Sequence, residues 1–201
     1  MHGGLSVNKR REEAIYELST RNVLFSCEGT AESVLIERLV EADKLIVPST
    51  NIVHDMDGNP CTNLRSAKDI QREFLGIDYP RGLLIARIVD SNPGRFLLEK
   101  PYRLSDIKVY DFITRPEIEV LVLVREKALD CFNGRSSSER QLNASDWCKQ
   151  KLGLTKIKTR AFLEGYWNDA DELVRCIREA NGKLGSNKND QLGLTDLLKQ
   201  S

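Results

Sequence analysis

Residues 23–32 of this chain read Val23-Leu24-Phe25-Ser26-Cys27-Glu28-Gly29-Thr30-Ala31-Glu32. A short apolar run ends at an acid and a glycine, and apolar residues then recur at helical spacing up to residue 42. This order predicts a buried strand followed at once by a helix, with Glu28 in the turn between them. In open α/β sheets, ligands bind at the carboxyl ends of the strands. Glu28 is therefore the first candidate functional residue, and Glu32 follows one helical turn later on the same side.

The rest of the chain predicts the same class of fold. Further strands are expected at residues 45–47, 82–89 and 107–113, and helices at 31–42, 66–75 and 117–129. Strands that alternate with helices up to about residue 130 predict a mostly parallel α/β sheet flanked by helices. The last third is expected to be helical, at 145–152, 158–167 and 170–180. We therefore divide the chain into a polar N-terminal lead (1–21), an α/β domain (22–132) and a helical C-terminal extension (140–201).

The charge balance argues against a strongly basic nucleic-acid binder. The 201 residues include 30 Lys and Arg and 30 Asp and Glu, so the formal net charge is zero. Only a local basic patch could contact a phosphate backbone. One candidate lies near Trp147 in the C-terminal third, and its residues are Lys149, Lys151, Lys156, Lys158 and Arg160. The alternative is an ordinary solvated helix surface.

The cysteines and the N-terminus predict a cytoplasmic protein. The chain has five cysteines, an odd number, and no C-x-x-C pair. A zinc site or a secreted disulfide framework is therefore not expected. The first residues lack a basic region followed by an apolar stretch, which predicts no signal peptide. No apolar run approaches the roughly 20 residues that cross a bilayer, so no membrane contact is expected.

Acidic residues follow several of the predicted strands. Glu28 ends the first strand, Asp90 ends the strand at 82–89, and Glu117 and Glu119 follow the strand at 107–113. Parallel strands bring their carboxyl ends to one edge, and Mg²⁺ binds through one or two carboxylates while keeping several waters. A magnesium site at that edge is one reading. The other is that these acids act as helix caps or as partners of helix dipoles.

The segment at residues 27–32 resembles the first motif of the Toprim (topoisomerase–primase) fold, and the likeness extends over residues 22–130. The resemblance implies that a strand-end Glu and a later Asp-x-Asp bind Mg²⁺ (or Mn²⁺) for phosphoryl transfer. This chain has Asp90-Ser91-Asn92 at the second motif, so Asn92 replaces an aspartate there. Within this fold, the chain resembles small Toprim-like nucleases of the overcoming-lysogenization-defect type. Their late acidic segment opens a helix, as residues 114–119 are expected to do.

The resemblance implies an endonuclease of phage defence or of a mobile element, with nucleic acid as substrate and an ATPase subunit as a partner. It assigns catalytic roles to Glu28, Glu117 and Arg115, and metal binding to Glu28, Asp90, Asn92 and Glu119. In this assignment Glu117 and Glu119 compensate for the missing aspartate, and Arg115 contacts phosphate. The alternative is a non-catalytic Toprim-like module that binds nucleic acid or protein. The oligomeric state is left open.

The Asp-x-Asp at residues 55–57 and the arginine at position 87 each allow more than one interpretation. The literal Asp-x-Asp at residues 55–57 follows Glu28 too closely to be the second motif, so we interpret it as a turn, with a metal motif as the alternative. Arg87 interrupts an apolar strand. An edge strand would explain Arg87, and so would pairing with an acid or contact with a phosphate. Arg95 and Arg115 flank the same predicted edge.

Overall fold

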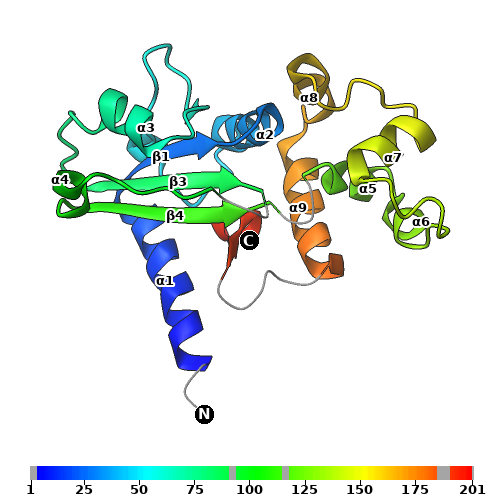
Figure 1. The fold of residues 1–201 in the computed structure, drawn as a ribbon, viewed down its shortest axis with the longest axis horizontal. Coiled ribbons are helices and arrows are strands. Elements are labelled where there is room, and N and C mark those ends of the chain that lie inside the picture. The colour runs from blue at the N-terminus through cyan, green and yellow to red at the C-terminus, as the bar shows by residue number, and fades with distance from the viewer. Residues whose placement is uncertain (1–3, 91–93, 115–117, 185–190, 201) are drawn as a thin grey trace.

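The computed structural model describes residues 4–90, 94–114, 118–184 and 191–200. Figure 1 shows a central sheet with helices around it. In chain order the elements are α1 (Gly4–Thr20), β1 (Asn22–Cys27), α2 (Thr30–Glu41), η1 (Ser49–Asn51), β2 (Cys61–Thr62), α3 (Ala67–Phe74), β3 (Leu83–Val89), α4 (Lys100–Arg103), β4 (Ile107–Ile113), α5 (Val120–Arg125), α6 (Leu129–Asn133), α7 (Ala144–Lys151), α8 (Arg160–Tyr166), α9 (Ala170–Leu184), β5 (Leu192–Gly193) and η2 (Leu194–Leu197).

The sheet has five strands in the order β2-β1-β3-β4-β5, and every neighbouring pair is parallel. The register places Asn22 opposite Leu83 and Leu83 opposite Ile107, so the three long strands start level with one another. All residues of the central strand β3 are buried. Interior parallel strands covered on both faces read as continuous apolar runs, which is how β3 reads apart from Arg87. The predicted α/β class with a parallel sheet is confirmed.

The two faces of the sheet pack against different helices. On one face, Phe25 and Ile88 join the larger hydrophobic core with residues of α1, α2, α5 and α9. On the other face, Leu24 and Ile85 join a smaller core with Ile70 and Phe74 of α3. Alternate strand residues point to opposite faces, so the side chain of Arg87 lies on the α3 face.

The last third of the chain is helical, as predicted. Elements α5 to α9 gather beyond the carboxyl ends of the long strands, toward which the arrowheads in Figure 1 point. Their buried residues, including Leu123, Trp167 and Leu173, belong to the same hydrophobic cluster as the sheet residues Phe25 and Ile88. The helices therefore complete the core that covers one face of the sheet.

The structure differs from the predicted secondary structure in four places. Residues 45–47 form no strand of the sheet. Instead Leu45 makes a single antiparallel bridge to Leu198. The second strand is β2, at Cys61–Thr62, where no strand is expected from the sequence. The N-terminal lead, where only a short helix around residues 12–18 is expected from the sequence, contains the 17-residue helix α1, and the polar C-terminus supplies β5.

Candidate active site at the carboxyl edge of the sheet

Glu28 lies directly after β1 and links that strand to β3. Its backbone N–H donates to the carbonyl of Ile88 (2.9 Å), which continues the β1–β3 ladder by one residue. Its carboxylate oxygen Oε2 accepts the backbone N–H of Asp90 (2.9 Å). A charged acceptor makes a strong hydrogen bond to a backbone N–H. The Glu28 carboxylate is therefore held across the ends of two neighbouring strands.

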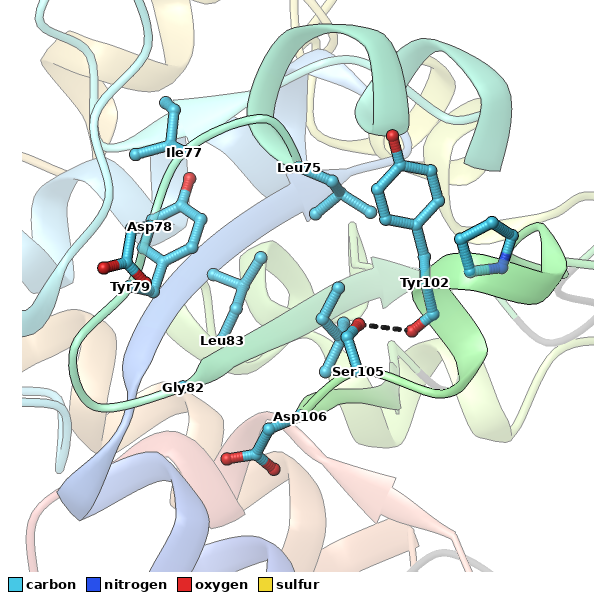
Figure 2. Close-up of a pocket in the computed structure, with 11 residues that line it drawn as sticks. Leu75, Ile77, Asp78, Tyr79, Gly82, Leu83, Tyr102, Ser105 and Asp106 are labelled. Atoms are coloured by element: carbon cyan, nitrogen blue, oxygen red, sulfur yellow. Dashed lines mark hydrogen bonds between the residues drawn. The ribbon is translucent and has the colours of Figure 1, made fainter.

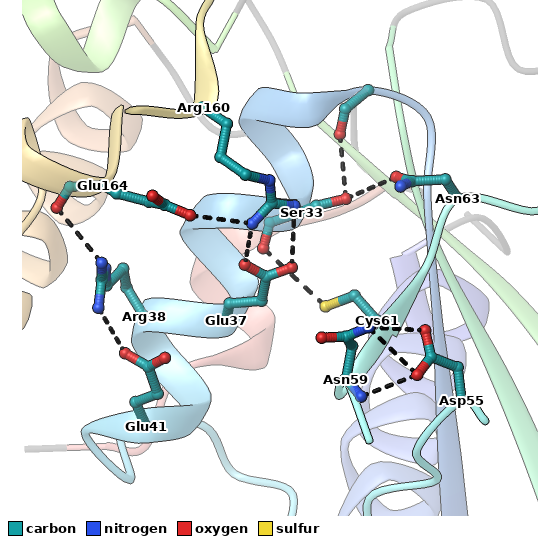
Figure 3. A network of polar contacts seen from close by, with 11 residues as sticks. Ser33, Glu37, Arg38, Glu41, Asp55, Asn59, Cys61, Asn63, Arg160 and Glu164 are labelled. Atoms are coloured by element: carbon teal, nitrogen blue, oxygen red, sulfur yellow. Dashed lines mark hydrogen bonds and ion pairs between the residues drawn. The ribbon is translucent and has the colours of Figure 1, made fainter. Parts of the chain in front are cut away.

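The turn into α2 brings Glu32 back over the strand end. Gly29 has an extended backbone (φ −141°, ψ 175°), and α2 begins at the next residue. A Cβ at position 29 would lie 2.7 Å from Glu32 Oε2, closer than real contacts allow, so the absence of a side chain leaves room for this carboxylate. The buried Ser33 hydroxyl lies 2.8 Å from Asn63 Oδ1, as Figure 3 shows, and 3.2 Å from the carbonyl oxygen of Gly29, so its one proton is shared between two acceptors. The start of α2 is thereby fixed to the loop after β2.

A pocket of about 470 Å³ opens at this edge, and acidic side chains from three elements line it: Glu32, Asp90 and Glu119. Thr114, which follows β4, lines the pocket too and is held by its N–H and hydroxyl, both donating to the carbonyl of Val89 (2.9 and 3.1 Å). Glu119 precedes α5, is 8% exposed, and has Oε1 3.1 Å from Lys158 Nζ. We call this cavity the acidic pocket.

The carboxylates of this edge influence one another. Burial raises the pKa of Glu32, and the nearby charges of Glu119 and Glu28 raise it further, while Arg65 opposes the shift. Like charges held close together disfavour ionisation. The fold therefore concentrates negative charge at the carboxyl edge, and Lys158 offsets part of it at Glu119.

The structure places the sequence-predicted residues Glu28, Asp90 and Glu119 at one edge of the sheet. Among the residues that the structure describes, no group of three His, Cys, Asp or Glu side chains is arranged to hold a metal ion. The other predicted site residues, Asn92, Arg115 and Glu117, lie outside the described residues. The magnesium site therefore stays a prediction from the sequence.

The predicted basic patch is mostly paired with acids. Lys149 lies 3.1 Å from Asp146, Lys151 2.6 Å from Glu139, Lys158 3.1 Å from Glu119, and Arg160 2.7 Å from Glu37. Lys156 is exposed. Backbone binding to nucleic acid depends on uncompensated positive charge. The pairing lowers the positive potential of this patch. Lys158, through its contact with Glu119, lines the acidic pocket.

The literal Asp-x-Asp at residues 55–57 forms the predicted turn. Asp55 Oδ1 accepts the backbone N–H groups of Asp57 (3.0 Å) and Asn59 (2.8 Å). Gly58 completes the turn with a positive φ of 83°, which glycine tolerates without strain. The Asp55 carboxylate is therefore occupied by its own loop.

A further cavity of about 410 Å³ lies at the opposite, amino edge of β3 and β4 (Figure 2). Its walls are mainly apolar and aromatic and include Leu75, Tyr79 and Tyr102. Asp106 at its rim pairs with Arg21 at 2.8 Å. Ligands of open α/β sheets bind at the carboxyl edge of the sheet. We therefore assign the candidate site to the acidic pocket rather than to this cavity.

Sequence reasoning assigned no role to several residues that shape the carboxyl edge. Asn143 lines the acidic pocket from the N-cap of α7, and Arg65 reaches the edge from the loop after β2. Lys158 was assigned to nucleic acid, not to Glu119. The spacing from Glu28 marked Glu32 as its neighbour, but no periodic signal could have placed a loop arginine or a lysine 39 positions from its partner.

Compared with known proteins, the chain matches no family model, no curated protein and no solved structure. The Toprim resemblance of residues 27–32 therefore stays a prediction from the sequence. Within the described residues, no helix combines the length and apolar character that a membrane span requires.

Proposed function

We propose that this protein is a metal-dependent nuclease that transfers phosphoryl groups of nucleic acid to water at the acidic pocket. The observation that carries the proposal is that carboxylates from the first turn of α2, the end of β3 and the start of α5 line one pocket. Glu28, after β1, lies beside them, since its carboxylate accepts the Asp90 N–H and its charge acts on Glu32. Negative charge gathered at the carboxyl edge of a parallel sheet suits a cation-dependent reaction on a phosphate ester.

The donor set fits a hard divalent cation. Carboxylate oxygens are the ligands that Mg²⁺ and Mn²⁺ prefer, and Mg²⁺ needs few of them because it keeps its waters. The pKa of Glu32 is raised first by burial and then by the charges of Glu119 and Glu28, and a bound cation would oppose this shift by favouring the charged carboxylate. No three of the described side chains are arranged to hold an ion, so one or two carboxylates of the acidic pocket (Glu32, Asp90, Glu119) would bind it together with waters. The ion would supply charge neutralisation at the phosphate and a more acidic bound water.

The protein's own side chains have distinct roles in this proposal. Glu28 Oε2 is engaged by the Asp90 N–H, which leaves Oε1 to take a proton from an attacking water. Lys158, now 3.1 Å from Glu119, would turn to a phosphate oxygen when a substrate enters. Asn92, Arg115 and Glu117 keep the roles that the Toprim resemblance gives them. The cytoplasmic setting in phage defence or a mobile element, and an ATPase partner, rest on that resemblance alone.

The test is cleavage of plasmid DNA and of single-stranded RNA by the purified protein with Mg²⁺ or Mn²⁺. We expect cleavage that EDTA abolishes, and a loss of about 100-fold or more in Glu28→Gln, which removes the proposed base. Asp90→Asn and Glu119→Gln should weaken Mn²⁺ binding in calorimetric titration. Glu41→Gln is the matched control, because that residue lies on α2 with its side chain 60% exposed and paired with Arg38. Wild-type protein that cleaves neither substrate with either metal would refute the proposal.

A non-catalytic binding module is the second candidate. The contact between Lys158 and Glu119 favours it, since a resident ammonium already neutralises one carboxylate of the pocket. On this reading the wild type binds nucleic acid or a protein partner in EDTA and cleaves nothing. Binding that persists in Glu28→Gln, together with absent cleavage in the wild type, would support the module over the enzyme.

A further inference from the structure

A second cavity of about 210 Å³ borders Glu28 on the α3 face of the sheet. Three arginines line it from different segments: Arg65 after β2, Arg87 within β3 and Arg95 in the loop after β3. We call it the arginine pocket. Pockets for drug-sized molecules usually exceed about 300 Å³, so this cavity suits a small anion with a few waters.

Arg87 is the fixed wall of the arginine pocket. Its side chain is 8% exposed, and its Nη1 donates to Asp111 Oδ1 at 2.8 Å. The register of β3 and β4 places these two residues directly opposite each other. The Arg87 guanidinium also lies over the ring of Phe96, 4.5 Å from the centroid. A guanidinium has five N–H donors, so the bond to Asp111 leaves donors in a fixed orientation for an anion.

Arg65 is carried by a loop that is bonded to the core. The Ser26 hydroxyl on β1 donates to the carbonyl of Leu64 (2.6 Å), one residue before Arg65. Ser33 holds Asn63 from α2, as Figure 3 shows, and the N–H of Leu64 donates to Thr62 Oγ1 (3.1 Å). The backbone that presents Arg65 is therefore positioned before any ligand arrives.

The charges of the arginine pocket are unbalanced. Its three guanidinium groups face one lining carboxylate, that of Glu28, and Asp111 pairs with Arg87 behind them. Arg65 and Arg95 are exposed, and in the part of the chain that the structure describes neither forms an ion pair. Convergent guanidinium groups match the oxygens of a phosphate in bidentate geometry.

We propose that the arginine pocket binds a phosphate group and so anchors a nucleic-acid strand next to Glu28. That the ligand is a nucleic-acid strand rests on the proposed function. The new element is the place where the protein binds the phosphate of that strand. Glu28 borders the arginine pocket and is bonded to Asp90 of the acidic pocket. A phosphate held by the arginines would therefore place the neighbouring linkage of the strand toward the carboxylates.

The test is binding without catalysis. A fluorescein-labelled single-stranded oligonucleotide is titrated in EDTA and read by anisotropy, with a methylphosphonate copy of the same sequence as the uncharged comparison. The variant is Arg65→Gln/Arg95→Gln, because both side chains are exposed and their loss leaves the core intact. The control is Arg103→Gln, an exposed arginine on α4. Inorganic phosphate is tested separately as a stabiliser, by the melting temperature in phosphate against chloride at equal ionic strength.

We expect the double variant to bind the phosphodiester strand about tenfold or more weakly and to lower the salt slope by about one unit per arginine. The control Arg103→Gln should bind the phosphodiester strand as tightly as the wild type does. The affinity for the methylphosphonate copy should be the same in the wild type and the double variant. Stabilisation by phosphate that the double variant loses, without strand binding, would support the phosphate site and assign it to a free phosphate instead. Equal binding of strand and phosphate by wild type and double variant would overturn the inference.

The same measurements separate this inference from the proposed function. A wild type that binds through Arg65 and Arg95 but cleaves nothing would refute the nuclease and leave the phosphate site standing. A wild type that cleaves, while the double variant cleaves with unchanged KM, would refute the phosphate site and leave the nuclease standing.

Discussion

The carboxylate of Glu32 is placed where its charge is disfavoured. Burial and the neighbouring carboxylates raise its pKa in the folded protein, whereas in the unfolded chain it has the ordinary value near 4.3. Between those two pKa values the folded state binds more protons than the unfolded state, so stability falls as pH rises. The stabilising term is fully present below the unfolded pKa and is lost as pH rises through the folded one.

We expect Glu32→Gln to melt at a higher temperature than the wild type at pH 8, because the substitution removes the disfavoured charge. The difference should shrink to nothing near pH 4, where both proteins are neutral at this position. Thermal unfolding followed by circular dichroism between pH 4 and 8 measures it, with Glu41→Gln as the control. If the melting temperatures of Glu32→Gln and wild type change with pH in parallel, the pKa of Glu32 is not raised in the folded protein.

At the residue scale, the sequence located some members of the site and not others. Glu28 was predictable because a strand end followed by a helix fixes where a side chain emerges. Arg87 stood out because an arginine inside an apolar run needs a partner, and Asp111 is that partner. Arg65 was not predictable, since its position depends on hydrogen bonds from Ser26 and Ser33 that carry no periodic pattern.

At the scale of elements, length decided what could be predicted. Strands β1, β3 and β4 are six or seven residues long, and their apolar runs identified them. Strands β2 and β5 have two residues each, too few for any alternation to appear. The apolar run at 45–47 resembled a strand, but its Leu45 pairs with Leu198 in a single bridge instead.

The helices α2 and α8 are joined by an ion pair that also steadies the site, because α2 carries Glu32. Arg160 contacts both oxygens of Glu37, at 2.7 and 3.2 Å, as Figure 3 shows. Their side chains are 43% and 18% exposed, so solvent screens the pair only in part. Bidentate geometry makes such a pair stronger than a typical surface contact.

We expect a double-mutant cycle of Glu37→Gln and Arg160→Gln to give a coupling of about 0.5–1 kcal/mol. Urea denaturation at low salt measures it, and added salt should reduce it. The pair Asp146 and Lys149, one turn apart within α7 and joined by a single contact of 3.1 Å, is the control and should couple by only about 0.2–0.5 kcal/mol. A zero coupling for the first pair would mean that this ion pair does not help to hold α8 against α2.

At the scale of the molecule, the sheet and the C-terminal helices share one hydrophobic cluster. Trp167 is 1% exposed and belongs to that cluster, with the Tyr166 ring edge-on at 5.0 Å. The sequence suggested a boundary between an α/β domain and a helical extension because strands stop near residue 130. The change from strands to helices near residue 130 does not divide the hydrophobic core, because sheet and C-terminal helices contribute to the same cluster.

We expect Trp167→Ala to cost about 3–5 kcal/mol, the usual penalty for deleting a buried aromatic side chain. Because the core is shared, each protein should unfold in a single transition. For each protein, calorimetry and far-UV circular dichroism should give the same transition temperature. Trp167→Phe serves as the milder variant if the alanine form does not fold. Two separate transitions in the wild type would show that residues 140–201 unfold as an independent unit.

The brevity of the two outer strands has a consequence for the protein in a crowded cell. An exposed sheet edge is a template onto which a strand of another chain can add. Here β2 and β5 flank the sheet with only two residues each. However, β5 pairs only with Phe112 and Ile113, so residues 107–111 of β4 have no strand partner on that side among the described residues. This part of β4 is where a strand of another chain could extend the sheet.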